Sequence, residues 1–257
     1  MRRIIAFPCG DDTLIGSLDE APGKTGLLIV SGGNELRCGA HRGMAALATQ
    51  LAAGGFPVFR FDRRGIGDSS GVNDGFESAS DDVRAAADAF RSAAPGIARV
   101  VGFGNCDGAS ALALFGGAAG IDRLVLANPW ITEATDALPP AAAIRARYAE
   151  RLRDPREWMR FARGGVSPNK LVAGLRKSLG PAPAGVVALE EAVFGALDPD
   201  RTTIILAERD ATAIAFRAAA RRRGYPGRII AIDTASHSFS RTEDKAALLA
   251  AIGTAIG

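Results

Sequence analysis

Apolar positions along this chain form short, nearly continuous runs that alternate with longer stretches of helical periodicity. Short apolar runs bounded by glycine or aspartate are typical of buried strands, and the longer patterns are typical of amphipathic helices. The strands predicted in this way are 24–33, 56–62, 98–105, 121–130, 201–210 and 227–237. The predicted helices are 42–55, 78–96, 107–120, 211–224 and one from about 242. This alternation predicts an α/β fold, with a mostly parallel central sheet and helices on both faces.

The alternation lapses between 131 and 200, where an arginine-rich helical pattern occupies 139–165. Ligands bind at the carboxyl edge of open α/β sheets, so a long insertion between two strand units predicts a helical cap over the site. A solvated helical pair that adds only stability is the alternative. The predicted organisation is an α/β core, formed by 1–130 and 201–257, with a helical cap insertion at 131–200.

Composition narrows the class of protein. With 257 residues, of which 47% are hydrophobic and 23% charged, the chain can bury one large core. No apolar run approaches the roughly 20 residues that span a bilayer, and the N-terminal apolar segment is too short for a signal peptide. We therefore expect a soluble cytoplasmic protein without membrane insertion. The 31 basic residues nearly balance the 28 acidic ones and aromatic residues make up only 6%, so no nucleic-acid partner is expected.

The three cysteines, Cys9, Cys38 and Cys106, are odd in number and widely spaced. This spacing fits neither a disulfide framework nor a zinc site, so reduced thiols without a metal or other cofactor are expected. Cys106 differs from the other two because it lies in the sequence GNCDG at 104–108, between a predicted strand and a predicted helix. A sharp strand-to-helix turn projects its central side chain into a cleft, and flanking glycines avoid Cβ clashes. The N–H of Asp107 and the helix N-terminus would then stabilise a thiolate and a developing oxyanion.

This motif resembles the nucleophile elbow of the α/β-hydrolase superfamily, with cysteine in place of the usual serine. The segment DRRGIGDSSG, at 62–71, is similar to a motif that many members carry after the preceding strand. The cysteine elbow, the segment GGNELRCGAHRG at 32–43 and the chain length most resemble the hydrolase 1 proteins associated with exosortase A systems. That resemblance implies a link to exopolysaccharide gene clusters but names no substrate. Dienelactone hydrolases also use a cysteine in this fold.

The superfamily order of nucleophile, acid and histidine implies the other two members of a triad. Of the two histidines, His237 follows the last predicted strand, where the resemblance places the base, whereas His41 precedes the nucleophile. The acid should follow the strand at 201–210, where Asp210 fits better than Glu208. A structural role for Asp210, as the cap of the following helix, is the alternative.

The superfamily takes the second oxyanion donor from the loop after an early strand, which here is SGGNELRCG at 31–39. Asn34 or a neighbour is therefore the expected donor beside Asp107, with Gly32 and Gly33 allowing close approach. Arginines near the predicted mouth could favour an anionic substrate or only brace the loops; they are Arg37, Arg42, Arg63 and Arg64. By analogy with dienelactone hydrolases, Glu35 could keep the Cys106 thiol protonated at rest. A surface ion pair of Glu35 with Arg37 or Arg63 is the alternative.

These residues predict a hydrolase that cleaves a small-molecule ester, thioester or lactone through a thioacyl-enzyme intermediate. Two other functions remain open. An acyltransferase would use the same triad but pass the acyl group to a sugar or other alcohol. A non-catalytic binding protein could use the same scaffold. The sequence predicts no oligomeric state.

Overall fold

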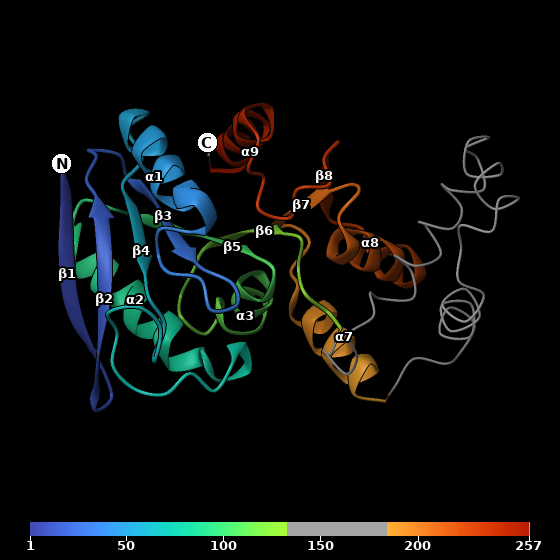
Figure 1. Ribbon diagram of the computed structural model, residues 1–257, viewed down its shortest axis with the longest axis horizontal. Coiled ribbons are helices and arrows are strands. Elements are labelled where there is room, and N and C mark those ends of the chain that lie inside the picture. The colour runs from blue at the N-terminus through green and yellow to red at the C-terminus, as the bar shows by residue number, and fades with distance from the viewer. Residues whose placement is uncertain (133–183, 257) are drawn as a thin grey trace, which may run out of the picture.

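The computed structural model describes residues 1–132 and 184–256 of the chain. Eight strands form one sheet in the order β1-β2-β4-β3-β5-β6-β7-β8 (Figure 1). The strands are β1 (Arg2–Cys9), β2 (Asp12–Asp19), β3 (Thr25–Val30), β4 (Val58–Phe61), β5 (Arg99–Asn105), β6 (Arg123–Ala127), β7 (Thr202–Ala207) and β8 (Arg228–Ile232). From β4 to β8 along the sheet every neighbouring pair is parallel. The predicted mostly parallel sheet is confirmed.

The antiparallel end of the sheet is the part that the sequence pattern missed. β1 and β2 form a hairpin, and β2 continues antiparallel to β4. β1 is an edge strand whose first residues are exposed on both faces, with Ile4 62% exposed. Without a continuous buried face, its apolar residues give only a weak strand signal.

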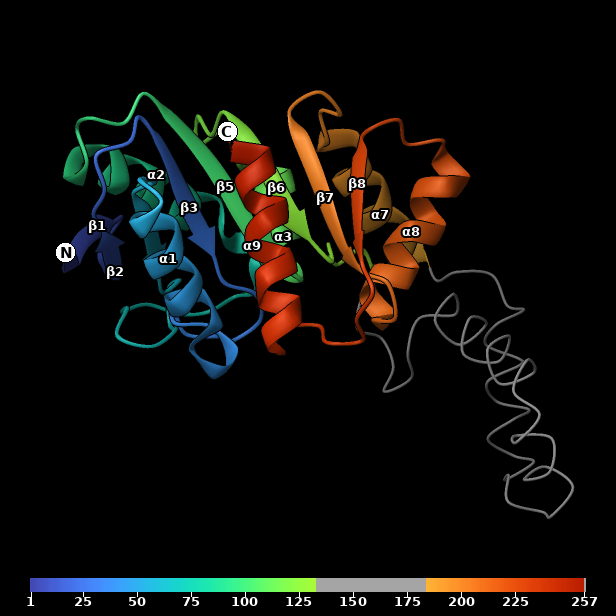
Figure 2. The ribbon, with the colours of Figure 1, turned by 90° about the horizontal axis from the view of Figure 1, so that it is seen from above.

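Helices cover both faces of the sheet, as predicted. The described helices are α1 (Gly43–Ala53), α2 (Ser80–Ala93), α3 (Asp107–Phe115), α7 (Ala184–Ala196), α8 (Ala211–Arg223) and α9 (Thr242–Ile256), with short 3-10 turns η1 (Ala40–Arg42) and η2 (Phe76–Ser78). In Figure 2, α1 and α9 lie on one face and the other four helices lie on the opposite face. None of the helices described combines the length and apolar character needed to cross a bilayer.

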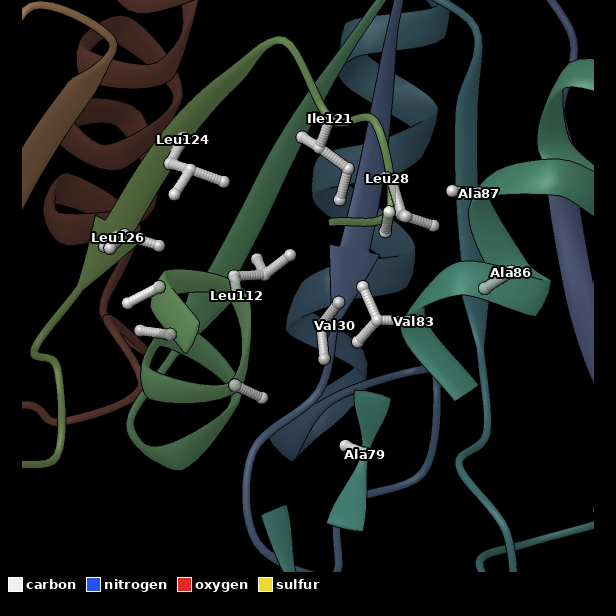
Figure 3. Packing of buried hydrophobic residues seen from close by; sticks show 14 of the residues in the cluster. Leu28, Val30, Ala79, Val83, Ala86, Ala87, Leu112, Ile121, Leu124 and Leu126 are labelled. Carbon is white, nitrogen blue, oxygen red and sulfur yellow. The ribbon is translucent and has the colours of Figure 1, made fainter. Parts of the chain in front are cut away.

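The larger of two apolar clusters fills the space between the sheet and the helices α2, α3, α7 and α8. Figure 3 shows how it interdigitates, with Leu28 and Val30 from β3 facing Val83 from α2 and Leu112 from α3. All four of these side chains are at most 1% exposed. Because α3 is packed this tightly, its N-terminus and the turn before it occupy a fixed position at the sheet edge.

The C-terminal part of the predicted cap insertion, 131–200, contains helix α7, which packs on the apolar cluster of the core. Helix α7 lies within the predicted insertion, yet Leu189 and Val193 are buried in the same cluster as α3 and α8, together with Leu197. Phe194 also stacks on Phe216 of α8, with ring centroids 5.0 Å apart. The segment from 184 to 200 is therefore part of the core. The rest of the predicted cap, 133–183, lies outside the described residues.

Candidate active site

Cys106 occupies a strained turn between β5 and α3. Its φ of 59° and ψ of −128° lie outside the regions that non-glycine residues commonly adopt. The turn is held by the N–H of Cys106, which donates to the Ala127 carbonyl on β6, and by its carbonyl, which accepts from Ala109 and Ser110 of α3. Such strain persists only where the surroundings fix the backbone, and it is common at functional sites. The thiol thus stands at the start of α3, in the favourable field of a helix N-terminus.

The glycines on either side of this turn are required by close backbone contacts. A Cβ on Gly104 would lie 2.6 Å from the carbonyl carbon of Gly108. A Cβ on Gly108 would lie 2.5 Å from the Val30 carbonyl oxygen of β3. Both distances are shorter than any real contact of a Cβ atom, so the spacing G-x-C-x-G follows from the packing of α3 against β3 and β5.

Asp210 follows β7 and serves two functions at once. It is the N-cap of α8, and its Oδ2 accepts the N–H groups of Thr212 at 3.0 Å and Ala213 at 3.1 Å. The same Oδ2 lies 3.1 Å from Nδ1 of His237. Burial opposes ionisation of this carboxyl, but its hydrogen bond to His237 and the two backbone N–H groups outweigh burial and lower its pKa. The two predicted roles, helix cap and partner of the base, are both present.

His237 lies in the loop between β8 and α9, with its side chain about one-third exposed. The hydrogen bond that His237 donates to Asp210 and the contact with Cys106 favour the charged imidazole, which raises the pKa of His237 to about 10 although burial acts in the opposite direction. Because Nδ1 faces Asp210, Nε2 is the ring nitrogen left for Cys106. The structure therefore brings Cys106, His237 and Asp210 together from the carboxyl ends of β5, β8 and β7.

The competing candidates do not join this group. Glu208 forms an ion pair with Arg217 of α8, with 2.8 Å between its Oε1 and Nη1. His41 is exposed in the turn η1, before α1. Neither contacts Cys106 through any hydrogen bond or ion pair of the described residues.

The loop after β3 passes directly beside the thiol. A Cβ on Gly32 would lie 3.2 Å from Cβ of Cys106 and 2.8 Å from Oδ1 of Asp107, so only glycine permits this approach. The N–H of Gly33 donates to Oδ1 of Asp107, which ties the loop to the elbow. The side-chain oxygen of Asn34 accepts from Asn73 at 2.8 Å, so the Asn34 side chain is turned to a neighbouring loop. The two expected oxyanion donors are thus both near Cys106 in the chain or the fold: Asp107 is the first residue of α3, and Asn34 follows Gly33, whose N–H is bound to Asp107.

Arg37 and Arg64 brace loops, and we assign no substrate contact to either. The Arg37 guanidinium pairs with Asp62 and Asp68 and donates to Ser17. That of Arg64 pairs with Asp82 and donates to the Ser78 carbonyl. Asp62 and Asp82 are both buried, and the sequence analysis did not single them out.

The ion pair expected for Glu35 is also absent from the described residues. Arg37 pairs with Asp62 and Asp68. Arg63 donates to the Gly33 carbonyl, and its Nη2 lies 3.9 Å from the Asp107 carboxylate. The described contacts of Glu35 include no hydrogen bond to Cys106 either. The carboxylate that the structure places next to Cys106 is that of Asp107.

The remaining cysteines are unlike Cys106. Cys9 is 5% exposed on β1 and contacts Asp82, and burial together with that carboxylate raises the pKa of its thiol to about 11. Cys38 is half-buried in the loop after β3. All three cysteines are free thiols in the structure.

The sequence profile of a family described as the alpha/beta hydrolase family matches residues 27–252. The chain belongs to the alpha/beta hydrolase family. The matched segment includes all three of Cys106, Asp210 and His237, and it ends within α9. The family accounts for the sheet order and for a site at the carboxyl ends of the strands.

Solved structures share this alpha/beta hydrolase fold at low sequence identity. Esterase Pf2001 of Pyrococcus furiosus has a TM-score of 0.64 at 15% identity, covering 100% of this chain and 94% of its own. DcsB, solved with its substrate analogue, has a TM-score of 0.66 at 14% identity, covering 100% and 99%. The thioesterase domain of the curacin biosynthetic pathway has a TM-score of 0.59 at 15% identity, covering 98% and 99%. No curated protein matches the chain in sequence.

Proposed function

We propose that this hydrolase cleaves a small-molecule ester, thioester or lactone with Cys106 as nucleophile, His237 as acid and base, and Asp210 as the residue that orients the imidazole. The observation that carries this proposal is the pairing of Asp210 with His237, 3.1 Å apart, next to a cysteine in a strained elbow. A nucleophile, a base and a group that orients the base are the parts that acyl transfer needs.

The electrostatics of His237 suit a cysteine nucleophile. His237, whose raised pKa favours the imidazolium, takes the thiol proton, and the sulfur attacks the acyl carbon as a thiolate. The C–S bond forms as the carbonyl π electrons move to oxygen. When this intermediate collapses, the bond to the leaving group breaks, and His237 gives its proton to the departing alcohol or thiol.

Deacylation reverses the role of the same imidazole. Once Cys106 carries the acyl group, one cause of the raised pKa of His237 is removed, so a larger fraction of the imidazole is neutral and able to accept a proton. It accepts a proton from water as the water oxygen attacks the thioester carbon. The C–S bond then breaks, the carboxylic acid leaves and the thiolate is restored.

The oxyanion would be stabilised by the N–H of Asp107, at the start of α3, with the N–H of Asn34 as second donor. From the resemblance to the hydrolase 1 proteins of exosortase A systems, we also propose that the reaction serves exopolysaccharide metabolism in the cytoplasm. The resemblance alone supports that assignment.

The test is a panel of p-nitrophenyl esters and acyl thioesters, with the intermediate trapped and located by mass spectrometry. We expect turnover, an acyl adduct on Cys106, and complete loss of both in Cys106→Ala. Cys38→Ala is the matched control and should retain turnover. Hydrolysis by Cys106→Ala at the wild-type rate would overturn the proposal. Transfer of the acyl group to an added alcohol, in preference to water, would make the enzyme an acyltransferase with the same intermediate.

A further inference from the structure

Two buried asparagines meet beneath the loop that carries His237. Asn105 is the last residue of β5, and Asn128 follows the end of β6; they are 8% and 0% exposed. Nδ2 of Asn128 donates to the His237 carbonyl at 3.1 Å and to Oδ1 of Asn105 at 3.1 Å. Nδ2 of Asn105 donates to the same His237 carbonyl at 3.2 Å. One backbone carbonyl thus accepts from two buried amides.

The orientation of both amides is fixed by a group that can only donate. The backbone N–H of Ala207, at the end of β7, donates to Oδ1 of Asn128 at 2.8 Å. Nδ2 of Asn128 must therefore point toward Asn105 and His237. Because this Nδ2 donates to Oδ1 of Asn105, Nδ2 of Asn105 is in turn directed at His237. The network has one consistent assignment of donors and acceptors.

The network joins the three strand ends that carry the candidate triad. β5, β6 and β7 are neighbours in the sheet, and the His237 loop follows β8 at the adjoining edge (Figure 2). Asn105 is covalently bonded to Cys106, so its side chain connects the nucleophile's turn to the base's backbone. Asn128 is held with a φ of 43°, a conformation that asparagine tolerates better than most residues, and its N–H donates to the Ile205 carbonyl.

The loop's other anchors lie away from His237 itself. Thr234 donates to Asp244 of α9 at 2.8 Å and accepts from the N–H of Ser236 at 3.0 Å. These contacts fix the start of the loop to α9. Among the described residues, the hydrogen bonds that connect the sheet to the backbone of His237 are those from the side-chain amides of Asn105 and Asn128.

We propose that Asn105 and Asn128 are positioning residues that set the height of His237 above the sheet, so that its imidazole reaches Asp210 and Cys106 at the same time. The expected effect on kcat rests on the proposed function, whereas the expected effect on the position and pKa of the His237 imidazole does not. Small displacements of a reacting group, on the order of 1 Å, cost about a hundred-fold in rate.

Asn128→Asp gives a test in which pH switches the hydrogen bond to His237 on and off within one variant. The introduced carboxyl keeps an acceptor for Ala207 in both of its protonation states. Only its protonated form can donate to the His237 carbonyl, and burial raises the pKa of such a group. We expect the ratio of variant to wild-type kcat to fall with rising pH, by about ten- to a hundred-fold, while KM changes little. Asn128→Leu should be slow at every pH.

A readout that needs no substrate separates this inference from the proposed function. In the uncharged variants Asn128→Leu and Asn105→Ala, the NMR titration of His237 should show a lower pKa, because its contacts with Asp210 and Cys106 lengthen. Thr202→Val, which removes a buried hydroxyl at the first residue of β7, is the control for replacing a buried polar side chain at the other end of the sheet.

The outcomes divide clearly. A lowered pKa of His237 in the asparagine variants, with no change in Thr202→Val, supports the positioning role even if every ester and thioester fails as substrate. An unchanged pKa in folded Asn128→Leu and Asn105→Ala overturns it. So does a pH-independent ratio for Asn128→Asp, or a loss of activity that Thr202→Val reproduces. Asn105→Ala keeps the test available if the Asn128 variants do not fold.

Discussion

The carboxylate of Asp107 accepts from the backbone N–H of Gly33, so the residue after Cys106 ties the loop that follows β3 to the elbow. Arg63, 4% exposed, completes the tie because it donates to the Gly33 carbonyl and lies 3.9 Å from the same carboxylate. The Gly33 peptide is thus held at both its N–H and its carbonyl. This arrangement fixes where the next N–H, that of Asn34, lies relative to Cys106.

Removing this tie should slow the chemical step. We expect Asp107→Ala to lower kcat by about ten- to a hundred-fold, somewhat less than the full loss of an oxyanion donor. Asp107→Asn retains an oxygen that can accept from Gly33, so it should recover most of the rate. Steady-state kinetics on the best ester decide the matter. A rise in kcat for Asp107→Ala would mean instead that the carboxylate masks the Gly33 N–H, and that this N–H is the second donor.

Stability and activity should separate at Asp210, because one oxygen caps α8 and orients His237. Asp210→Asn can still cap the helix, but its amide stabilises the imidazolium poorly and favours the wrong tautomer. We expect kcat to fall by several orders of magnitude with little change in unfolding free energy. Asp210→Ala should lose the activity and also about 1 kcal/mol of stability.

Urea denaturation measures the stability arm, and Glu208→Gln is the matched control for a neighbouring carboxylate. The double variant with His237→Ala should be hardly slower than either single variant, because the groups act as a unit. Additive losses would contradict a shared role. Full activity in His237→Ala together with inactivity in His41→Ala would reassign the base.

Much of the core follows from local patterns, whereas the contacts that finish the site do not. The elbow was predictable because Gly104, Cys106 and Gly108 act within one turn of chain. Asn128 and His237 are 109 residues apart, and only the parallel order of β5, β6 and β7 brings the asparagine beneath the histidine. A lone polar residue at a strand end carries no such information in the sequence.

Side-chain direction was a second limit of the sequence. The expected partners of Glu35 were arginines close to it in the chain, but Arg37 turns to Asp62 and Arg63 turns to Gly33 and Asp107. Arginine-rich loops offer several ion pairs of similar energy, and the packing of the loops selects among them. Likewise, the helical pattern of α7 does not reveal that its apolar side chains pack against α3 and α8.

The raised pKa of His237 makes the folded protein less stable as the pH rises. Its ordinary value is 6.5 and its value in the folded protein is about 10. The folded state therefore binds this proton more tightly than the unfolded state, and the stabilisation is complete below about 6.5 and lost as the pH rises toward 10. We expect the stability of the wild type, relative to His237→Gln, to fall across that interval. Urea denaturation at several pH values measures it.

The two causes of this shift can be separated by NMR, because the chain contains only two histidines. Cys106→Ala removes the contact with sulfur and should lower the pKa of His237, while Asp210 continues to raise it. Asp210→Ala should lower it further, since the hydrogen bond that His237 donates to Asp210 is the larger cause. An unchanged titration in Cys106→Ala would show that the thiol and the imidazole are not in contact in solution.

Alkylation should distinguish the cysteines by their surroundings. Cys106 stands at the N-terminus of α3 beside His237, whereas Cys9 is buried on β1, where burial and Asp82 raise the pKa of its thiol to about 11. Since the thiolate is the reacting species, iodoacetamide at neutral pH should label Cys106 first and leave Cys9 unmodified until the protein unfolds. Peptide mapping by mass spectrometry identifies the site.

Two variants test what controls the labelling of Cys106. His237→Ala should slow the labelling at neutral pH, because the imidazolium that stabilises the thiolate is gone. Glu35→Gln should leave the pH profile of Cys106 labelling unchanged, because the described contacts of Glu35 include none with the thiol. A shift to lower pH in Glu35→Gln would show that this carboxylate does reach Cys106 in solution, and faster labelling of Cys9 than of Cys106 would remove the physical basis for assigning Cys106 as the nucleophile.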